Sequence, residues 1–330
     1  MAVVATGFFD GVHLGHRKVI EALLLESSRR GEKAVVITFW PHPRTVLQQD
    51  ARQLRLLTSL EEKRELLMGL GVDRVEVIPF TREFASMSAV QYLEMLRSEF
   101  GASCLVLGYD TRFGSDLLAP DSLPAVAASI GIDTITAEKL DSPEAEAGAD
   151  GLTRATLGNV RGGTACGGVG TADGQAVSTS LSRTPAISST RIRKSLEQGD
   201  VESAAAMLGY RYQLHGVVVG GNQLGRTIGF PTANLRLYDP LKLIPGNGVY
   251  QTEVQVLGKT FRGMTNIGVR PTVSSGNHVV IETNILDFDE MIYGLDLNLT
   301  FVRKIRDERR FDSLEALSAQ LRTDRDACAL

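Results

Sequence analysis

Cysteine is scarce in this chain of 330 residues, which has only three. Cys104, Cys166 and Cys328 lie far apart in the sequence and form no Cys-x-x-Cys pair. A disulfide framework and a zinc knuckle are therefore excluded, and the cytoplasm is the expected location. No apolar run reaches the roughly 18 residues of a membrane-spanning helix, and no basic leader precedes an apolar signal segment. We expect a soluble, unprocessed chain with no membrane partner.

The chain also has little net charge. It contains 35 Lys and Arg residues against 39 Asp and Glu residues, for a formal net charge of -4. This balance argues against a nucleic-acid partner, because such proteins present an excess of basic residues. Hydrophobic residues make up 43% of the chain, and its length exceeds one typical hydrophobic core, so two domains are expected. We expect a monomer or a weak oligomer.

Residues 1 to 140 alternate short β-rich runs with helical patterns, which predicts a Rossmann-like α/β domain with a parallel sheet. The predicted strands are 3–6, 34–39, 74–78 and 104–107. Two helix starts pair a serine with Glu or Gln three residues later, Ser59 with Glu62 and Ser88 with Gln91. This first domain is predicted to span residues 1–200.

Residues 141–186 break the pattern, because 27 of these 46 residues are Gly, Ala, Ser or Thr and none is aromatic. Such a segment buries too little apolar surface to offset its chain entropy, so a flexible insertion is predicted. Helical patterns follow at 188–199 and 200–208. The second domain, residues 201–330, is predicted to be a small antiparallel β-barrel with a C-terminal helix, its main strands being 214–219, 248–256, 279–285 and 297–302.

The most informative motif is Gly7-Phe-Phe-Asp-Gly-Val-His-Leu-Gly-His16, between the first strand and the first helix. A Gly-rich loop that enters a helix points backbone N–H groups and the positive end of the helix dipole at one place, which suits phosphate. His13 and His16 are three residues apart and project to one side of a helical turn. Two imidazoles there can stabilise the charge of a phosphoryl displacement without a protein nucleophile. The phosphate-binding candidates in the loop are Gly7, Phe8, Asp10 and Gly11.

A second motif, Ile187-Ser-Ser-Thr-Arg-Ile-Arg193, opens the helix after the insertion. Its hydroxyl and guanidinium groups could hold the β- and γ-phosphates of ATP, and the candidates are Ser189, Thr190, Arg191 and Arg193. Loops at 39–44 and 107–114 follow two strands of the sheet, where α/β domains bind ligands. Phe39 and Phe113 could flank a flat ring there, and Asp110 could accept a hydrogen bond from adenine or ribose. Taken one at a time, such aromatic residues are more often part of ordinary core packing.

In the second half, Gly220-Gly-Asn-Gln-Leu-Gly-Arg-Thr-Ile-Gly-Phe-Pro-Thr-Ala-Asn234 predicts a mobile loop that covers phosphates. The nucleotide-binding candidates in this loop are Gly225, Arg226 and Gly229. Thr232 and Asn234 are two residues apart on an extended segment. Both supply oxygen atoms of the kind that Mg²⁺ takes beside nucleotide phosphates.

His-x-Gly-His after the first strand, together with the Ser-Ser-Thr-Arg element, resembles the nucleotidyltransferase superfamily that joins the α-phosphate of ATP to an acceptor. The 220–234 motif resembles the riboflavin kinase module. Apart from residues 141–186, nearly the whole chain resembles the bacterial bifunctional riboflavin kinases and FAD synthetases. The resemblance implies that the barrel phosphorylates riboflavin with ATP, and that the first domain adenylylates FMN to FAD and releases pyrophosphate.

The resemblance also implies catalytic roles. Glu282 would be the general base that takes the proton of the riboflavin 5′-hydroxyl, which requires its carboxylate within hydrogen-bond reach of that hydroxyl. Without the resemblance, a Glu in a strand is more often a solvated outward side chain. Arg191 would act with His13 and His16 in the adenylylation step.

Ligands follow from the same resemblance. Mg²⁺ would be held by Thr232 and Asn234, and riboflavin, FMN and ATP would be the substrates. Besides the loop aromatics, the residues implied to contact flavin are Tyr250, Arg306 and Phe311, the last two in a flap before the C-terminal helix.

The chain departs from the family pattern at three positions. The family commonly has Asn where Phe8 and Asp110 stand, and His where Asn284 stands. A working kinase with an impaired or silent first domain is therefore an alternative, although a retired domain has no chemical reason to keep both histidines. A flavin-sensing or RNA-binding module is disfavoured by the acidic balance and by the absence of a basic, aromatic strand face.

Overall fold

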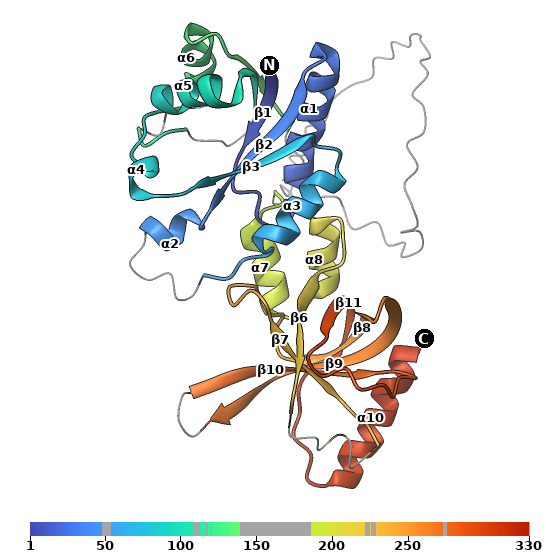
Figure 1. The fold of residues 1–330 in the computed structure, drawn as a ribbon. Helices are drawn as coiled ribbons and strands as arrows, with labels where there is room; N and C mark the ends of the chain where they lie inside the picture. The colour runs from blue at the N-terminus through green and yellow to red at the C-terminus, as the bar shows by residue number, and fades with distance from the viewer. Residues whose placement is uncertain are drawn as a thin grey trace, which may run out of the picture. The chain divides into compact units, whose positions relative to one another are not determined.

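The computed structural model describes residues 1–47, 54–108, 113–116, 118–119, 121–138, 186–221, 225, 229–272 and 276–329 (Figure 1). All but the last residue of the predicted insertion at 141–186 lies outside these ranges, as do the candidates Asp110 and Arg226. Met1–Leu140 and Ile187–Leu330 form one compact unit.

Five parallel strands form the sheet of the first half, in the order β3-β2-β1-β4-β5. They are β1 (Ala2–Thr6), β2 (Lys33–Trp40), β3 (Arg74–Pro79), β4 (Ala102–Leu107) and β5 (Asp133–Thr136). The four predicted strands are confirmed, whereas β5 escapes sequence analysis because its run Asp-Thr-Ile-Thr has a single apolar residue. The strand order reverses between β1 and β4, and ligands of such sheets bind at the carboxyl ends of the strands beside that reversal.

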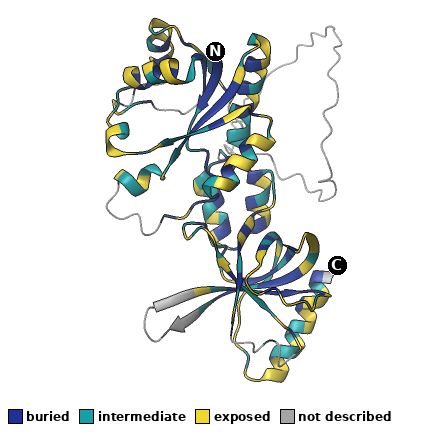
Figure 2. Cartoon of the chain, in the orientation of Figure 1, coloured by how far each residue is buried: buried dark blue, intermediate teal, exposed yellow. Residues whose placement is uncertain are grey.

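Helices cover both faces of this sheet (Figure 1). They are α1 (Leu14–Arg30), α2 (Pro43–Leu47), α3 (Leu60–Gly69), α4 (Arg82–Ala85), α5 (Ala89–Phe100) and α6 (Leu123–Ser129). Val3 belongs to the buried cluster that includes α1 and α3, and its neighbour Val4 belongs to the cluster that includes α5 and α6. Figure 2 shows buried residues along the strands between them. The predicted capping boxes of α3 and α5 are confirmed.

Six antiparallel strands close into a barrel in the second half, in the order β10-β7-β6-β11-β8-β9. They are β6 (Gln213–Val219), β7 (Ala233–Leu237), β8 (Gly248–Val256), β9 (Lys259–Thr272), β10 (Gly276–Ile285) and β11 (Asp296–Arg306). The predicted barrel and its four predicted strands are confirmed. Sequence analysis misses β7 and β9, the latter because Gly263, Gly268 and Pro271 interrupt its apolar pattern. Gly263 is needed, since a Cβ there would lie 2.4 Å from Val254 Cγ2 on the neighbouring strand.

Two helices precede the barrel, α7 (Ser189–Glu197) and α8 (Val201–Leu208), and α10 (Leu314–Ala329) follows it. Ser188 caps α7 and Asp200 caps α8, so both predicted helices are confirmed. Ile192 and Leu196 of α7 share one buried cluster with the barrel strands. Packing of the barrel core therefore continues across residue 200, where the sequence analysis places the domain boundary.

A short segment before α3 contacts the chain before β8. The backbone N–H of Leu56 donates a hydrogen bond to Leu241 O at 2.8 Å. Lys242 is 5% exposed, donates to Leu57 O at 2.8 Å and forms an ion pair with Glu62 of α3. These contacts anchor the segment that in turn holds the Gly-rich loop after β1.

Candidate active sites

The Gly-rich loop between β1 and α1 has an unusual backbone. The angle φ is positive at Phe9 (51°), Gly11 (79°) and Val12 (38°). Left-handed backbone is costly outside glycine, above all at a β-branched residue such as Val12, and it persists where the surroundings enforce it. The residues around this loop therefore determine whether it keeps its shape.

Asp10 fastens the loop to its surroundings. Its side chain is 4% exposed, and Oδ1 accepts hydrogen bonds from the backbone N–H groups of Leu57 at 3.0 Å and Thr58 at 3.2 Å. Its other carboxylate oxygen pairs with Arg193 at 2.5 Å. Ser189 Oγ donates to Asp10 O at 3.1 Å. Two candidate residues of α7 thus contact the loop, and the Asp10 carboxylate is engaged with protein groups.

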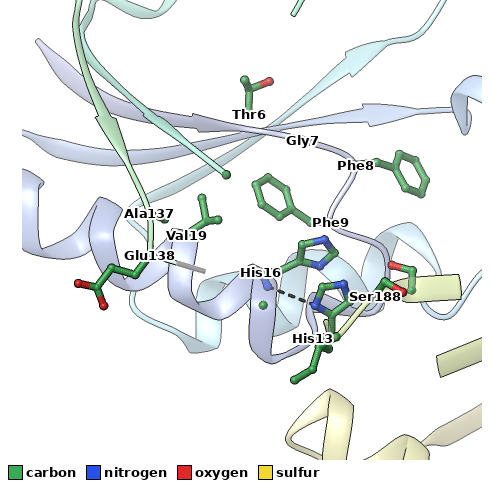
Figure 3. A pocket seen from close by; sticks show the side chains of 14 residues that line it. Thr6, Gly7, Phe8, Phe9, His13, His16, Val19, Ala137, Glu138 and Ser188 are labelled. Carbon is green, nitrogen blue, oxygen red and sulfur yellow. Dashed lines mark hydrogen bonds between the residues drawn. The ribbon is translucent and has the colours of Figure 1, made fainter. Parts of the chain in front are cut away.

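A cavity of about 310 Å³ opens beside this loop (Figure 3). It lies at the carboxyl ends of β1, β4 and β5 and at the N-termini of α1 and α7, where the strand order places a ligand site. The candidate residues in its wall are Gly7, Phe8, His13, His16 and Ser189. Gly11, Thr190 and Arg191 belong to the adjoining loop and helix without lining it.

His13 and His16 form a stacked pair in this wall (Figure 3). Their ring centroids are 3.6 Å apart and their planes differ by 13°. His13 is the N-cap of α1, and its Nδ1 accepts a hydrogen bond from the backbone N–H of His16 at 3.3 Å. That bond assigns the ring proton of neutral His13 to Nε2. His16 Nδ1 is buried and has no hydrogen-bond partner among the residues that the structure describes.

Both imidazoles are held neutral. Burial lowers the pKa of His13 to about 4; a backbone hydrogen bond opposes this shift and the nearby Arg193 charge adds to it. Burial also lowers the pKa of His16 well below its usual value, and the electrostatic interactions with His13 and Lys63 act in the same direction. The pair therefore offers N–H groups without the cost of a buried cation, a state suited to binding an incoming polyanion.

Lys63 is a residue that the sequence analysis misses. It lies in the first turn of α3, is 0% exposed, and sits with its Nζ 3.7 Å from the centre of the Phe8 ring. The adjacent capping box is the only sequence signal at this position, and it fixes the helix start without indicating which side chain is buried.

The candidate ring-binding aromatics lie in the core beside α5. Phe113 is 3% exposed, and its ring centroid is 5.1 Å from that of Tyr92. Phe39 lies 5.4 Å from Phe84 and is packed against the same buried cluster. Neither lines the cavity of the histidine pair, and their flavin contacts stay predictions.

In the barrel, β7 and β10 bring the kinase candidates together. Glu282 of β10 is half-buried and stands directly opposite Asn234 of β7 in the strand register. Thr232 comes two residues before Asn234. A base candidate and the two oxygen donors thus meet across one strand pair, although their catalytic roles stay predictions.

A second cavity, of about 260 Å³, lies beside these strands. Its wall is made of Thr232 with side chains of β6, β7, β10 and the segment after β10, among them Val218, Thr283, Phe288, Met291 and Tyr293. Most of its wall is apolar, which suits a flat ring, and the wall also contains the acidic residues Asp289 and Glu290.

The Gly-rich segment before β7 approaches the candidate metal ligands closely. A Cβ on Gly221 would lie 2.1 Å from Asn234 Nδ2, and one on Gly225 would lie 2.2 Å from Phe230 O and 3.5 Å from Thr232 Cγ2. The hydroxyl of Thr232 and the amide oxygen of Asn234 are hard, neutral donors, which fit a Mg²⁺ ion that keeps waters and phosphate oxygens as its other ligands. No cluster of three or more His, Cys, Asp or Glu residues that could hold a metal occurs in the described part of the chain.

Three flavin candidates have contacts of their own. Tyr250 is 0% exposed and its hydroxyl donates to Gly246 O, so this side chain belongs to the barrel core. Arg306 donates to the buried Asp324 of α10, with the shortest bond at 2.7 Å, and its guanidinium carbon lies 5.7 Å from the Phe311 ring. The predicted flap is therefore tied to the C-terminal helix.

Asn284 stands two residues after the base candidate, at a position where the family pattern has His. It is 6% exposed, and its Nδ2 donates to Pro231 O at 2.7 Å. The amide thus holds the residue before Thr232 in place, so this departure maintains the loop that carries the candidate metal ligand.

A parallel sheet with a Gly-rich loop and paired histidines, joined to a closed antiparallel barrel, places one candidate site in each half. Two family models match the chain, FAD synthetase over residues 1–147 and riboflavin kinase over residues 208–329, and so define a transferase with two sites. No helix in the described ranges has the length and apolar character of a membrane span.

Curated relatives match both halves together. The bifunctional riboflavin kinase/FMN adenylyltransferase of Listeria monocytogenes is 34% identical over 98% of this chain and 90% of the relative. Enzymes of the same name from Bacillus subtilis and Escherichia coli K12 are 32% and 34% identical over the same shares. A solved structure from Streptococcus pneumoniae, described as a macrolide-efflux protein, has a TM-score of 0.78 at 28% identity and covers 99% of this chain and 93% of that one.

The chain belongs to the family of bifunctional riboflavin kinase/FMN adenylyltransferases. It carries the FAD synthetase domain in its first half and the riboflavin kinase domain in its second. The predicted family, fold class and combination of two transferase activities are therefore confirmed.

Proposed function

We propose that this chain makes FAD from riboflavin in two ATP-dependent steps in the cytoplasm. Residues 201–330 phosphorylate riboflavin to FMN, and residues 1–200 then adenylylate FMN to FAD. The observation that carries the second step is the stacked, neutral His13–His16 pair at the helix start, in a cavity at the reversal of strand order. The family membership supports both steps.

In the adenylylation step an oxygen of the FMN phosphate attacks the α-phosphorus of ATP, and the bond from that phosphorus to the β-phosphate oxygen breaks. Pyrophosphate leaves, and no covalent intermediate with the protein forms. The N–H groups of His13, His16 and the start of α1 bind the oxygens on which negative charge grows. Ser189, Thr190, Arg191 and Arg193 bind the pyrophosphate portion of ATP.

In the kinase step Glu282 accepts the proton of the riboflavin 5′-hydroxyl while its oxygen attacks the γ-phosphorus of ATP and ADP leaves. Thr232 and Asn234 would hold Mg²⁺, which would supply positive charge to the ATP phosphates. The loop of Gly225, Arg226 and Gly229 covers these phosphates. Arg306 and Phe311 shape the flavin side of the site, and Tyr250 supports it from the barrel core.

The experiment is a time course of purified protein with riboflavin, ATP and Mg²⁺, in which the flavins are separated by chromatography. FMN should appear first and FAD later. FMN that accumulates without FAD, whether oxidised or reduced FMN is supplied, would contradict the adenylylation step and support a silent first domain. Omission of Mg²⁺ should stop both steps.

A further inference from the structure

Lys63 is buried directly behind the wall of the adenylylation cavity. Its side chain is 0% exposed, and Phe8, whose ring lies 3.7 Å from Lys63 Nζ, lines that cavity. Burying an ammonium costs free energy of folding unless partners compensate its charge. Within the described ranges it forms no ion pair with a carboxylate, so its contacts with Phe8 need a further explanation.

Lys63 holds Phe8 at two points. Its ammonium faces the Phe8 ring at the distance of a strong cation–π contact. It also donates to Thr38 Oγ1 at 3.3 Å, and Thr38 Oγ1 donates to the backbone oxygen of Phe8 at 3.1 Å. Thr38 is itself 0% exposed, so this chain of hydrogen bonds is shielded from water. One lysine thus fixes both the side chain and the backbone at the start of the loop.

The loop needs such fixing. Phe9 and Val12 have left-handed backbone, which residues other than glycine disfavour. Phe8 is the last residue before this stretch. Further along, Asp10 binds the amides of Leu57 and Thr58. The Lys63 contacts therefore hold the first end of the loop and the Asp10 contacts hold its middle, with the histidine pair at its far end.

The titratable groups around Lys63 leave its charge without a carboxylate partner among the described residues. Asp10 from the loop, His16 from α1 and His42 from the segment before α2 interact with it electrostatically. Burial keeps both imidazoles neutral, and Asp10 is paired with Arg193. On α3 itself, Glu62 is paired with Lys242. The Lys63 charge is therefore left for Phe8 and Thr38.

We propose that Lys63 is a positioning residue for FMN adenylylation, whose ammonium holds Phe8 and so keeps the Gly-rich loop in the shape that receives the nucleotide phosphates. This role rests on the proposed function of the first domain. It also gives the Phe8 ring a role, because an aromatic ring can bind an ammonium that lies over its face.

The charged form should be the active one. Burial lowers the pKa of Lys63 to about 8, although Asp10 opposes the shift. As the pH rises through that value in the free enzyme, Lys63 loses its proton and the cation–π contact disappears. Adenylylation kcat/KM for ATP, which reports groups of the free enzyme, should therefore fall on the alkaline side.

The test compares wild type with Lys63→Met and Lys63→Arg from about pH 6.5 to 9.5, with riboflavin phosphorylation measured on the same preparations. Lys63→Met should lower adenylylation kcat/KM at neutral pH roughly 10- to 100-fold, because displacing a catalytic loop by about 1 Å has effects of that order. It should also remove the alkaline decline. Lys63→Arg, which stays charged throughout, should restore part of the rate and show no decline. Kinase activity should be unchanged in both.

Matched variants separate positioning from folding. Lys33→Met removes an exposed lysine at the end of β2 far from Thr38 and should leave both activities unchanged. Thr38→Val breaks the hydrogen-bond chain and leaves Lys63 in place, so it should lower the rate while the alkaline decline persists; it tests the proposal even if Lys63→Met does not fold. In a Phe8→Leu background, Lys63→Met should cost less than in wild type.

Several results would overturn the proposal. An alkaline decline with the same midpoint in Lys63→Met would show that another group titrates. An equal loss of kinase activity would show that the lysine is merely structural. If wild type forms FAD and Lys63→Met forms it at the same rate, only the role of Lys63 is overturned. If wild type forms no FAD, the proposed function of the first domain is overturned as well.

Discussion

The two candidate sites obtain their charge in different ways. In the first half, Asp10, His13 and Lys63 are buried at the end of a parallel sheet and His16 is half-buried. The imidazoles are held neutral, Asp10 is paired with Arg193, and the Lys63 ammonium lies over the Phe8 ring before any ligand arrives. In the barrel, Glu282 and Asn234 are half-buried on regular strands, with an apolar cavity beside them. The first site is preorganised by a loop whose left-handed backbone costs free energy, whereas the second relies on the charges of the ligands that we propose for it, ATP and Mg²⁺.

This contrast has a physical reason. Adenylyl transfer to a phosphate brings two polyanions together, so the protein must present N–H groups at fixed positions without a competing counter-ion. Phosphorylation of a neutral hydroxyl needs a base and a metal-bound nucleotide, which a strand pair and a covering loop can supply. Variants at the two sites should therefore separate the activities.

The largest effect is expected for Glu282→Gln. Loss of the general base should lower riboflavin phosphorylation on the order of 10²- to 10⁴-fold and leave FMN adenylylation unchanged. The two rates are measured separately, with riboflavin or FMN as the starting flavin. Glu253→Gln, at a half-buried glutamate of β8 that pairs with Arg211, is the control. Unchanged kinase turnover in Glu282→Gln would exclude this residue as the base.

The reverse is expected for His16→Ala. Removing one donor of the pair should lower adenylylation roughly 10²- to 10³-fold, because each preorganised donor contributes on that scale to transition-state binding. Riboflavin phosphorylation should stay normal. His215→Ala, at an exposed barrel histidine, should affect neither step. If His16→Ala impaired both activities equally, the comparison between the two sites would fail.

Acid should weaken the first half through its buried imidazoles. Above pH 6.5 His13 is neutral in the folded and unfolded chain; between pH 6.5 and about 4 only the unfolded chain takes up the proton. The free energy of unfolding should therefore fall by roughly 3 kcal/mol over that range. Trp40, the single tryptophan, reports this half by fluorescence in denaturant titrations.

His13→Asn sharpens this measurement, because Asn retains the helix N-cap without a titratable ring. The variant should be less sensitive to acid than wild type. An unchanged pH dependence of the Trp40 transition would show that the acid sensitivity arises elsewhere in the chain.

The smallest effect concerns two neighbouring glycines in the barrel. A Cβ on Gly221 would lie 2.1 Å from Asn234 Nδ2, whereas one on Gly220 would meet no atom within 4 Å. Gly221→Ala should raise the Mg²⁺ concentration needed for half-maximal kinase activity several-fold, while Gly220→Ala should not. Adenylylation serves as the internal control. Equal behaviour of the two variants would argue against a metal role for Asn234.

Sequence analysis reaches the parts of this molecule that depend on local chain chemistry. The spacing of His13 and His16 and the capping boxes are visible in the sequence, because each involves residues three apart. The neutral state of the pair is not, since it depends on burial that only the folded chain provides. Lys63 appears in sequence as one more lysine of an amphipathic helix.

The barrel shows the same division. β8 reads as a strand from its own residues, whereas β9 does not, because Gly263 makes sense only when Val254 on the neighbouring strand is known. Tyr250, expected at the flavin on the basis of resemblance, lies in the core with its hydroxyl bonded to Gly246 O. Long-range packing determines such positions, and a local pattern does not contain it.

The contacts of Lys242 predict how a truncated form of this protein should behave. Lys242 precedes the barrel strand β8 in the sequence. Its ammonium donates to Leu57 O and pairs with Glu62, close to the backbone amides that bind Asp10. A fragment that ends at residue 200 would lack this lysine and leave a half-buried carboxylate without its cation. Such a fragment should therefore be less stable than the same residues in the whole chain.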